Sequence, residues 1–258
     1  MKHWNWRPKL RWFAAEIAVV VVGVLIALAL NAWWQRLQAA EAQENYLALI
    51  SRDLGDMATN LEELQAYEDV QVEGGLEAYR IISANDQSPD SLVLVSDRLQ
   101  RLTGRRTMSA VDATYTDLTS TGNLPLIRNQ ALRDQIISYY EKVEREFEIH
   151  NKNNSFFVDE MFARLIEGSG LFVARGGANT IVNRIGGSDS LMTEALRGGY
   201  VNEPDAIWSL PYSSPEWARV KAQLVNRIRI SGHASLRARA LLEETRALRE
   251  AVEAELNR

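Results

Sequence analysis

One uninterrupted apolar stretch near the N-terminus constrains this chain more than any other feature of its sequence. Residues 12–34 have the sequence WFAAEIAVVVVGVLIALALNAWW, in which only Glu16 and Asn31 are polar. As a helix, these 23 residues would extend about 35 Å, more than the roughly 30 Å of a bilayer's hydrocarbon core. Trp12 and the Trp33–Trp34 pair stand at its two ends, where aromatic side chains anchor at headgroup level. We therefore expect one transmembrane helix over residues 12–34.

The charges on either side of the span predict its orientation. Residues 1–11 carry four basic side chains and no acid, whereas residues 35–60 carry two basic and four acidic side chains. Under the positive-inside rule, the N-terminus stays in the cytoplasm and residues 35–258 are translocated, which in a bacterial inner membrane places them in the periplasm. A cleaved signal peptide is the alternative, because a basic segment also precedes an apolar core there. Against cleavage, Glu16 falls inside that core and the small-residue candidate at residues 27–29 lies within the apolar run.

One face of the predicted span carries its small and polar residues. A helix places five residues, separated by 7, 4, 4 and 3 positions, in one stripe: Glu16, Gly23, Ala27, Asn31 and Trp34. The small pair at 23 and 27 allows a second backbone to approach closely, and Glu16 and Asn31 need hydrogen-bonding partners that lipid lacks. We interpret the stripe as a transmembrane interface with another helix. The alternative is that Glu16 reaches the cytoplasmic headgroups and pairs with Lys9 or Arg11.

This stripe also carries a resemblance to known proteins. The pattern E-x6-G-x3-A-x3-N-x2-W resembles the N-terminal signature of a large family of uncharacterised bacterial single-span membrane proteins. A second block resembles the family's pattern Y-x2-L-x2-sG-x-l-x-lI-x-N-x2-LR…YY: Tyr115, Leu118, Gly122, Leu126, Ile127, Asn129, Leu132, Arg133, Tyr139 and Tyr140. The resemblance covers residues 12–145, and Ala29 and Ala32 replace the polar residues usual around Asn31. It implies a single-span architecture and no particular activity.

Beyond the span, the hydrophobic periodicity predicts an all-α fold. Six apolar residues alternate spacings of 3 and 4, which is typical of a coiled-coil seam: Leu47, Ile50, Leu54, Met57, Leu61 and Leu64. The glycine pair at 74 and 75 is expected to end or bend this helix. The predicted segments are a stalk helix (35–84), a helical core (85–167), a Gly- and Pro-rich loop region (168–215) and a long C-terminal helix (216–258). Together they predict an antiparallel helical bundle on a stalk continuous with the membrane helix.

Local signals divide the helical core further. We expect a helix over residues 108–121 that ends at a left-handed Gly122, and a long helix that begins with Asn129 as its N-cap. The apolar seam of this long helix contains two polar residues, His150 and Asn154. Interior polar residues can fix the register and oligomeric state of packed helices, and this is our interpretation. The alternative is a pH-responsive histidine or a small-molecule site.

Residues 168–215 interrupt the helical pattern. They hold eight of the chain's 15 glycines, and no GxxxxGK[ST] sequence indicates a phosphate-binding loop. Long loops of this kind are often binding surfaces or mobile segments. We expect Trp217 to be a core residue, whereas Trp208 could be either a core residue or part of an exposed patch. Pro215 suits the first turn of the last helix.

Composition excludes several kinds of chemistry. The residues after the span carry 25 bases and 33 acids, a charge that disfavours nucleic-acid binding. Cysteine is absent, which rules out disulfides and thiolate catalysis. The three histidines form no HxxxH or HExxH pattern, and no GxSxG motif marks a nucleophile. We therefore expect no catalysis, no metal and no cofactor.

Two classes of function remain open. The first is an anchored interaction or scaffold subunit that associates with itself, as a homo-oligomer, or with another inner-membrane protein. The second is a ligand-binding sensor or accessory subunit of the periplasm. Only eleven residues precede the span, too few for an output domain, so a sensor would have to signal through a partner's transmembrane helix.

Overall fold

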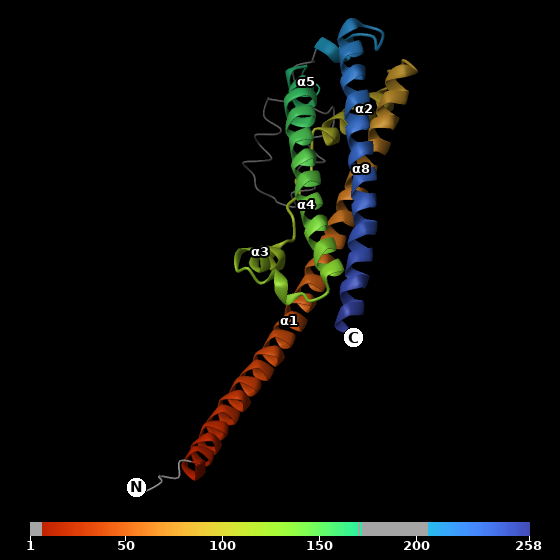
Figure 1. Ribbon diagram of the computed structural model, residues 1–258. Coiled ribbons are helices and arrows are strands. Elements are labelled where there is room, and N and C mark those ends of the chain that lie inside the picture. The colour runs from red at the N-terminus through yellow and green to blue at the C-terminus, as the bar shows by residue number, and fades with distance from the viewer. Residues whose placement is uncertain (1–6, 170, 172–205) are drawn as a thin grey trace, which may run out of the picture.

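The computed structural model describes residues 7–169, 171 and 206–258, and every regular element among them is a helix (Figure 1). The predicted all-α class is therefore confirmed for the part of the chain that is described. The prediction of a Gly- and Pro-rich loop region at 168–215 lies mostly outside the described residues.

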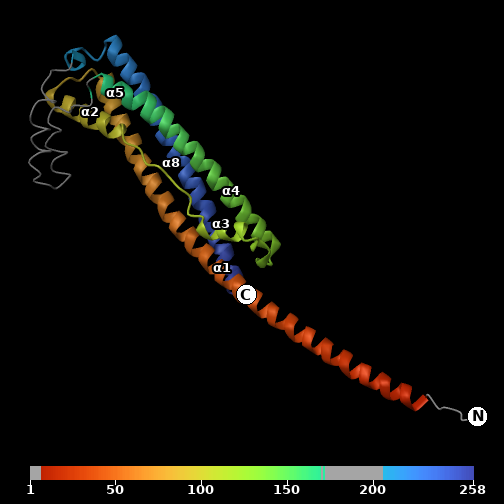
Figure 2. The ribbon, with the colours of Figure 1, turned by 90° about the vertical axis from the view of Figure 1, so that its left-hand side faces the viewer.

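A single helix, α1 (Arg7–Ser83), begins in the N-terminal segment and continues through the length of the bundle. Its first half projects away from the other helices in both ribbon views (Figures 1 and 2). This projecting half contains a stretch that is long and apolar enough to cross a membrane, and no part of that stretch is buried by the rest of the chain.

The glycine pair does not end α1, contrary to one of the two outcomes predicted from sequence, because the helix continues to Ser83. A Cβ atom on Gly75 would lie 2.5 Å from Cγ1 of Ile228, and one on Gly74 would lie 3.2 Å from Cδ of Arg98. The two glycines therefore allow neighbouring helices to approach α1 closely. This packing outweighs the lower helix propensity of glycine, which costs about 1 kcal/mol per residue relative to alanine.

Three long helices lie side by side and form the body of the molecule. The last helix, α8 (Pro215–Leu256), runs back along α1 towards its projecting half, so that the C-terminus lies near the point where α1 leaves the bundle (Figure 2). The third, α4 (Gln130–Asn153), continues through a π-helical segment, η2 (Asn154–Ala163), into α5 (Arg164–Gly168). Four shorter elements complete the described fold: α2 (Pro89–Leu102), α3 (Ala113–Ser120), η1 (Leu124–Leu126) and η3 (Ala206–Ser209).

The predicted seam of α1 forms part of the core. All six of its apolar residues, from Leu47 to Leu64, are at most 3% exposed and pack with residues of α4 and α8. The region predicted as a stalk at 35–84 is therefore integrated into the bundle from Leu47 onwards. A second core cluster lies further from the projecting half of α1 and contains Trp208, at 8% exposure, and Trp217, at 0% exposure. Trp217 is a core residue, as predicted.

Between α2 and α4 the chain departs from the predicted helix at 108–121. Only Ala113–Ser120 is helical, and residues 104–112 form a connector without regular secondary structure. Side chains of other helices satisfy the connector's backbone, because Asn151 bonds to both N and O of Met108, at 3.2 and 2.8 Å. Two caps agree with the predictions: Gly122 has φ of +72°, and the side chain of Asn129 accepts a hydrogen bond from the backbone N–H of Leu132.

Candidate functional site

The five residues of the predicted transmembrane interface lie on the projecting half of α1. Glu16, Gly23, Ala27, Asn31 and Trp34 are all exposed. A Cβ atom added to Gly23 would meet no atom within 4 Å, so no described segment of the chain packs against this position. Because α1 is one continuous helix, the stripe is rigidly connected to the seam inside the bundle.

His150 and Asn154 are both interior, at 8% and 1% exposure. Nε2 of His150 lies 2.9 Å from the carbonyl oxygen of Arg106, and Nδ2 of Asn154 donates to the same oxygen at 2.9 Å. The two side-chain nitrogens are 3.0 Å apart. Both residues therefore converge on one backbone acceptor of the connector between α2 and α3.

The polar pair holds this connector in place, whereas its predicted effect on helix register and oligomeric state stays a prediction. His150 and Asn154 fasten the connector to the bundle, and among the described residues they make no hydrogen bond to another long helix. Asn151 fastens the same segment at Met108, and the guanidinium of Arg106 forms an ion pair with Glu63 on α1. Together, His150, Asn151 and Asn154 hold the connector in one path across the bundle.

A buried ion pair escaped the sequence analysis. The side chains of Arg227 on α8 and Glu68 on α1 are 0% and 1% exposed, with Nη1 and Oε2 separated by 3.6 Å. Nε of Arg227 donates to the carbonyl oxygen of Leu102 at 2.9 Å, Nη2 donates to that of Gly104 at 3.1 Å, and Nη1 donates to the hydroxyl of Ser231. Arg227 thus supplies donors to carbonyls at the end of α2, which lack partners within their own helix.

The electrostatics of this pair are unusual for a core. Burial lowers the pKa of Arg227 below its ordinary value, and the charge of Glu68 opposes that effect. Neither carboxylate oxygen of Glu68 has a hydrogen-bond partner among the described residues. Desolvation of two charges is costly, so the pair fixes the position of α2 without being a strong source of stability.

The sequence did contain a signal for this pair. The alternating spacing of the α1 seam continues beyond Leu64 by steps of 4, 3 and 4 to Glu68, Gln71 and Gly75. A charged residue at a seam position requires a buried partner. The position of Glu68 was therefore visible in the sequence, whereas its partner on α8 was not.

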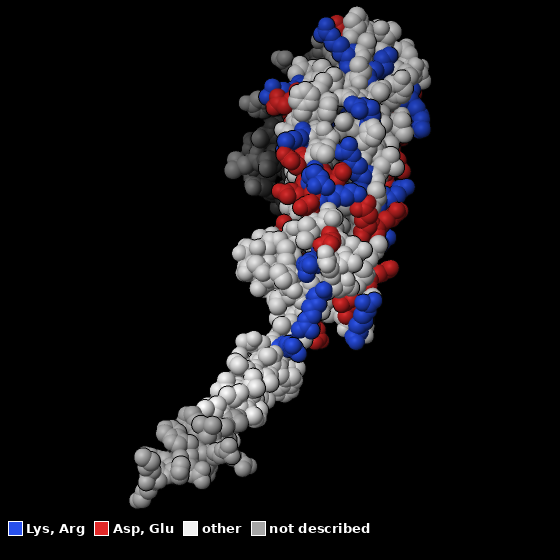
Figure 3. Space-filling model, viewed as in Figure 1, with Lys and Arg blue, Asp and Glu red and all other residues white. Residues whose placement is uncertain are grey.

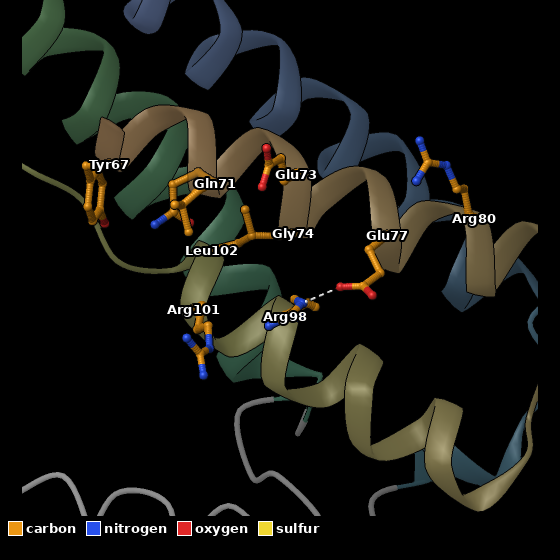
Figure 4. A pocket seen from close by; sticks show the side chains of 10 residues that line it. Tyr67, Gln71, Glu73, Gly74, Glu77, Arg80, Arg98, Arg101 and Leu102 are labelled. Atoms are coloured by element: carbon orange, nitrogen blue, oxygen red, sulfur yellow. Dashed lines mark hydrogen bonds and ion pairs between the residues drawn. The ribbon is translucent and has the colours of Figure 1, made fainter. Parts of the chain in front are cut away.

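A groove of about 660 Å³ lies between α1 and α2, close to the buried pair (Figure 4). Its lining includes charged side chains of both signs: Glu73, Glu77, Arg80, Arg98 and Arg101. Nε of Arg98 bonds to Oε2 of Glu77 at 2.6 Å, as the dashed line in Figure 4 shows. Tyr67 lies at one end of the groove, and burial raises its pKa above the ordinary value. The arrangement suits a polar molecule with charges of both signs.

Among the described residues, no three His, Cys, Asp or Glu side chains are grouped so that they could hold a metal ion. Comparison of the chain with protein-family models, with curated proteins and with solved structures found no match.

Proposed function

We propose that this chain is a membrane-anchored periplasmic protein that acts as a non-catalytic interaction or scaffold subunit. In this account α1 crosses the inner membrane with its N-terminus in the cytoplasm, and the helical bundle stands in the periplasm. The stripe from Glu16 to Trp34 contacts a helix of a second copy or of another membrane protein.

One observation carries the proposal: the stripe and the core seam belong to the same uninterrupted helix, α1. The stripe is exposed, and its carboxylate and amide groups cannot be satisfied by lipid. A contact made in the membrane would therefore be transmitted to the bundle through a rigid element. The basic residues that precede the span support the orientation.

Substitution within the stripe tests the association. Gly23→Leu should hold the partner backbone away and weaken association by about 1–2 kcal/mol. Val21→Leu, on another face of the same turn, should have no effect. Energy transfer between labelled chains in vesicles measures both variants, and equal transfer for the two would contradict the proposed interface.

Reporter fusions test the compartment separately. Alkaline phosphatase fused after Arg258 should be active in a bacterial host, because that enzyme folds only after export. An active cytoplasmic reporter at the same position would reverse the orientation. Release of a shortened soluble chain would identify residues 12–34 as a cleaved signal sequence.

A ligand-binding sensor is the second candidate, and the groove between α1 and α2 supports it. Charges of both signs line this groove, so a small zwitterion such as a free amino acid matches its chemistry. A rise in the melting temperature of the detergent-solubilised chain with one amino acid from a panel would favour this function. No rise with any of them at millimolar concentration would count against it.

A further inference from the structure

The end of the bundle nearest the projecting half of α1 is fastened to α1 at the place where the apolar span ends. Nη2 of Arg128 donates to the backbone oxygen of Arg36 at 3.3 Å, and the backbone N–H of Arg128 donates to Oε1 of Gln43 at 3.3 Å. Arg36 follows Trp34 by two residues. The connector between η1 and α4 is therefore held beside the first turn of α1 beyond the span.

The height of this contact relative to a membrane follows from helix geometry, and this step rests on the proposed anchoring. Two residues of helix correspond to about 3 Å along the axis, whereas each headgroup layer is about 5–7 Å thick. If Trp34 lies at headgroup level, Arg36 and Arg128 lie in the same layer. Leu37, which is 46% exposed, follows directly and can enter the same boundary.

Two arginines at this end of the bundle lack an acidic partner among the described residues. Among the described residues, neither Arg36 nor Arg128 has a carboxylate oxygen within ion-pair distance. The nearby acid Glu255 is already engaged, because it accepts from Asn129 at 2.8 Å and pairs with Arg258 at 2.9 Å. Figure 3 shows basic side chains, with acidic ones near them, at the end of the bundle from which the projecting half of α1 emerges.

We propose that Arg36 and Arg128 bind the phosphate groups of phospholipids in the leaflet next to the bundle. Guanidinium groups present several donors in a fixed plane, which suits phosphate oxygens. Arg128 uses one guanidinium nitrogen on Arg36, and its other guanidinium donors have no partner among the described residues. The bundle then rests directly on the membrane surface, without a spacer. An otherwise acidic domain thereby touches anionic lipid through two basic side chains.

Lipid retention tests the pair directly. The full-length chain is reconstituted in nanodiscs of phosphatidylcholine and phosphatidylglycerol and then released for native mass spectrometry. The native chain should retain phosphatidylglycerol, and Arg36→Gln should retain at least one molecule fewer. This variant keeps the backbone oxygen that Arg128 contacts, so the local fold is preserved. Arg36→Gln with Arg128→Gln should remove the preference for phosphatidylglycerol altogether.

Arg219→Gln is the matched control, since Arg219 is exposed near the start of α8, at the opposite end of the bundle. It should leave lipid retention unchanged. Equal retention by the native chain, the double variant and this control would overturn the inference while leaving membrane anchoring intact. A native chain that does not enter nanodiscs would refute the anchoring, and the inference with it.

A second measurement reports position without altering either arginine. Nickel ions bound to chelating headgroups should strongly increase the relaxation rate of a spin label on a single cysteine at Gln130. The same label at Ser83 lies about 70 Å along α1 from Arg36, and its relaxation rate should not change. Equal weak relaxation at both positions would show that the bundle stands away from the bilayer.

Discussion

Arg227 and Glu68 illustrate how a single buried charge can position a helix. Arg227→Met would leave the carboxylate of Glu68 buried without its counter-ion, along with two carbonyls at the end of α2. We expect a loss of about 3–5 kcal/mol in the free energy of unfolding. Denaturant titration of the chain in detergent measures it.

The double variant Arg227→Met with Glu68→Leu provides the control. It removes both charges and replaces them with apolar side chains, so it should regain much of the lost stability. A double variant no more stable than the single one would mean that the hydrogen bonds to α2 matter more than the unpaired charge.

The network around the carbonyl of Arg106 leads to an expectation that the sequence alone would not give. Leucine at seam positions usually stabilises packed helices, yet His150→Leu with Asn154→Leu would leave a partly buried carbonyl without its two partners. The expected loss in unfolding free energy is about 1–3 kcal/mol. Lys152→Leu, on the exposed side of the same turn, should change stability by less than about 0.5 kcal/mol. An unchanged or raised stability in the double variant would contradict the network.

Two neighbouring tyrosines should respond differently to removal of their hydroxyl groups. Burial raises the pKa of Tyr139 to about 12, and the pKa of Tyr140 is also raised by burial. The hydroxyl of Tyr139 bonds to Thr245 at 2.7 Å, whereas that of Tyr140 has no partner among the described residues. At neutral pH, Tyr139→Phe should therefore cost about 0.5–1.5 kcal/mol, and Tyr140→Phe should cost little or stabilise.

The raised pKa values also fix the direction of the pH dependence. The folded state holds these hydroxyl protons more tightly than the unfolded state. The contribution of the two tyrosines to the free energy of unfolding is therefore complete below pH 10 and is lost as the pH rises towards 12. Tyr140→Phe should reduce this alkaline loss. Denaturant unfolding curves at several pH values measure this change in the free energy of unfolding. If the variant and the native chain lose the same free energy at alkaline pH, Tyr140 does not contribute to the loss.

Among the helices, the contact between α1 and α8 depends on a position without a side chain. Gly75→Ala should destabilise the bundle although alanine is the better helix former, because its Cβ would collide with Ile228. Gly74→Ala is the matched comparison, since its Cβ would meet the flexible side chain of Arg98 at 3.2 Å. Thermal unfolding should place Gly75→Ala below the native chain and Gly74→Ala near or above it. The reverse order would restore the view that these glycines weaken the helix.

Periodicity was sufficient to predict the buried face of α1, because every seam residue from Leu47 to Leu64 repeats the same local pattern. The caps at Gly122 and Asn129 were also predictable, since each depends on residues close in sequence. The connector at 104–112 was not, because its path is fixed by Asn151, His150 and other side chains far along the chain. For the same reason, neither the partner of Glu68 nor the packing role of Gly75 could be predicted.

In the molecule as a whole, one continuous helix, α1, links an exposed apolar segment to a packed bundle. The stripe of Glu16, Gly23, Ala27 and Asn31 was derived from sequence spacing, and the other described segments leave it exposed. We propose that its partner is a helix of a second copy or of another membrane protein. The account depends on whether this face makes contact in the membrane.

Cysteine scanning through residues 16–34 tests this most directly, because the native chain contains no cysteine to interfere. Single-cysteine variants are expressed in cells, oxidised in the membrane, and analysed for crosslinks to a second copy or to another membrane protein. The account predicts crosslinking with helical periodicity and maxima at positions 16, 23, 27 and 31. A uniform or absent signal would contradict it and would leave α1 as an anchor alone.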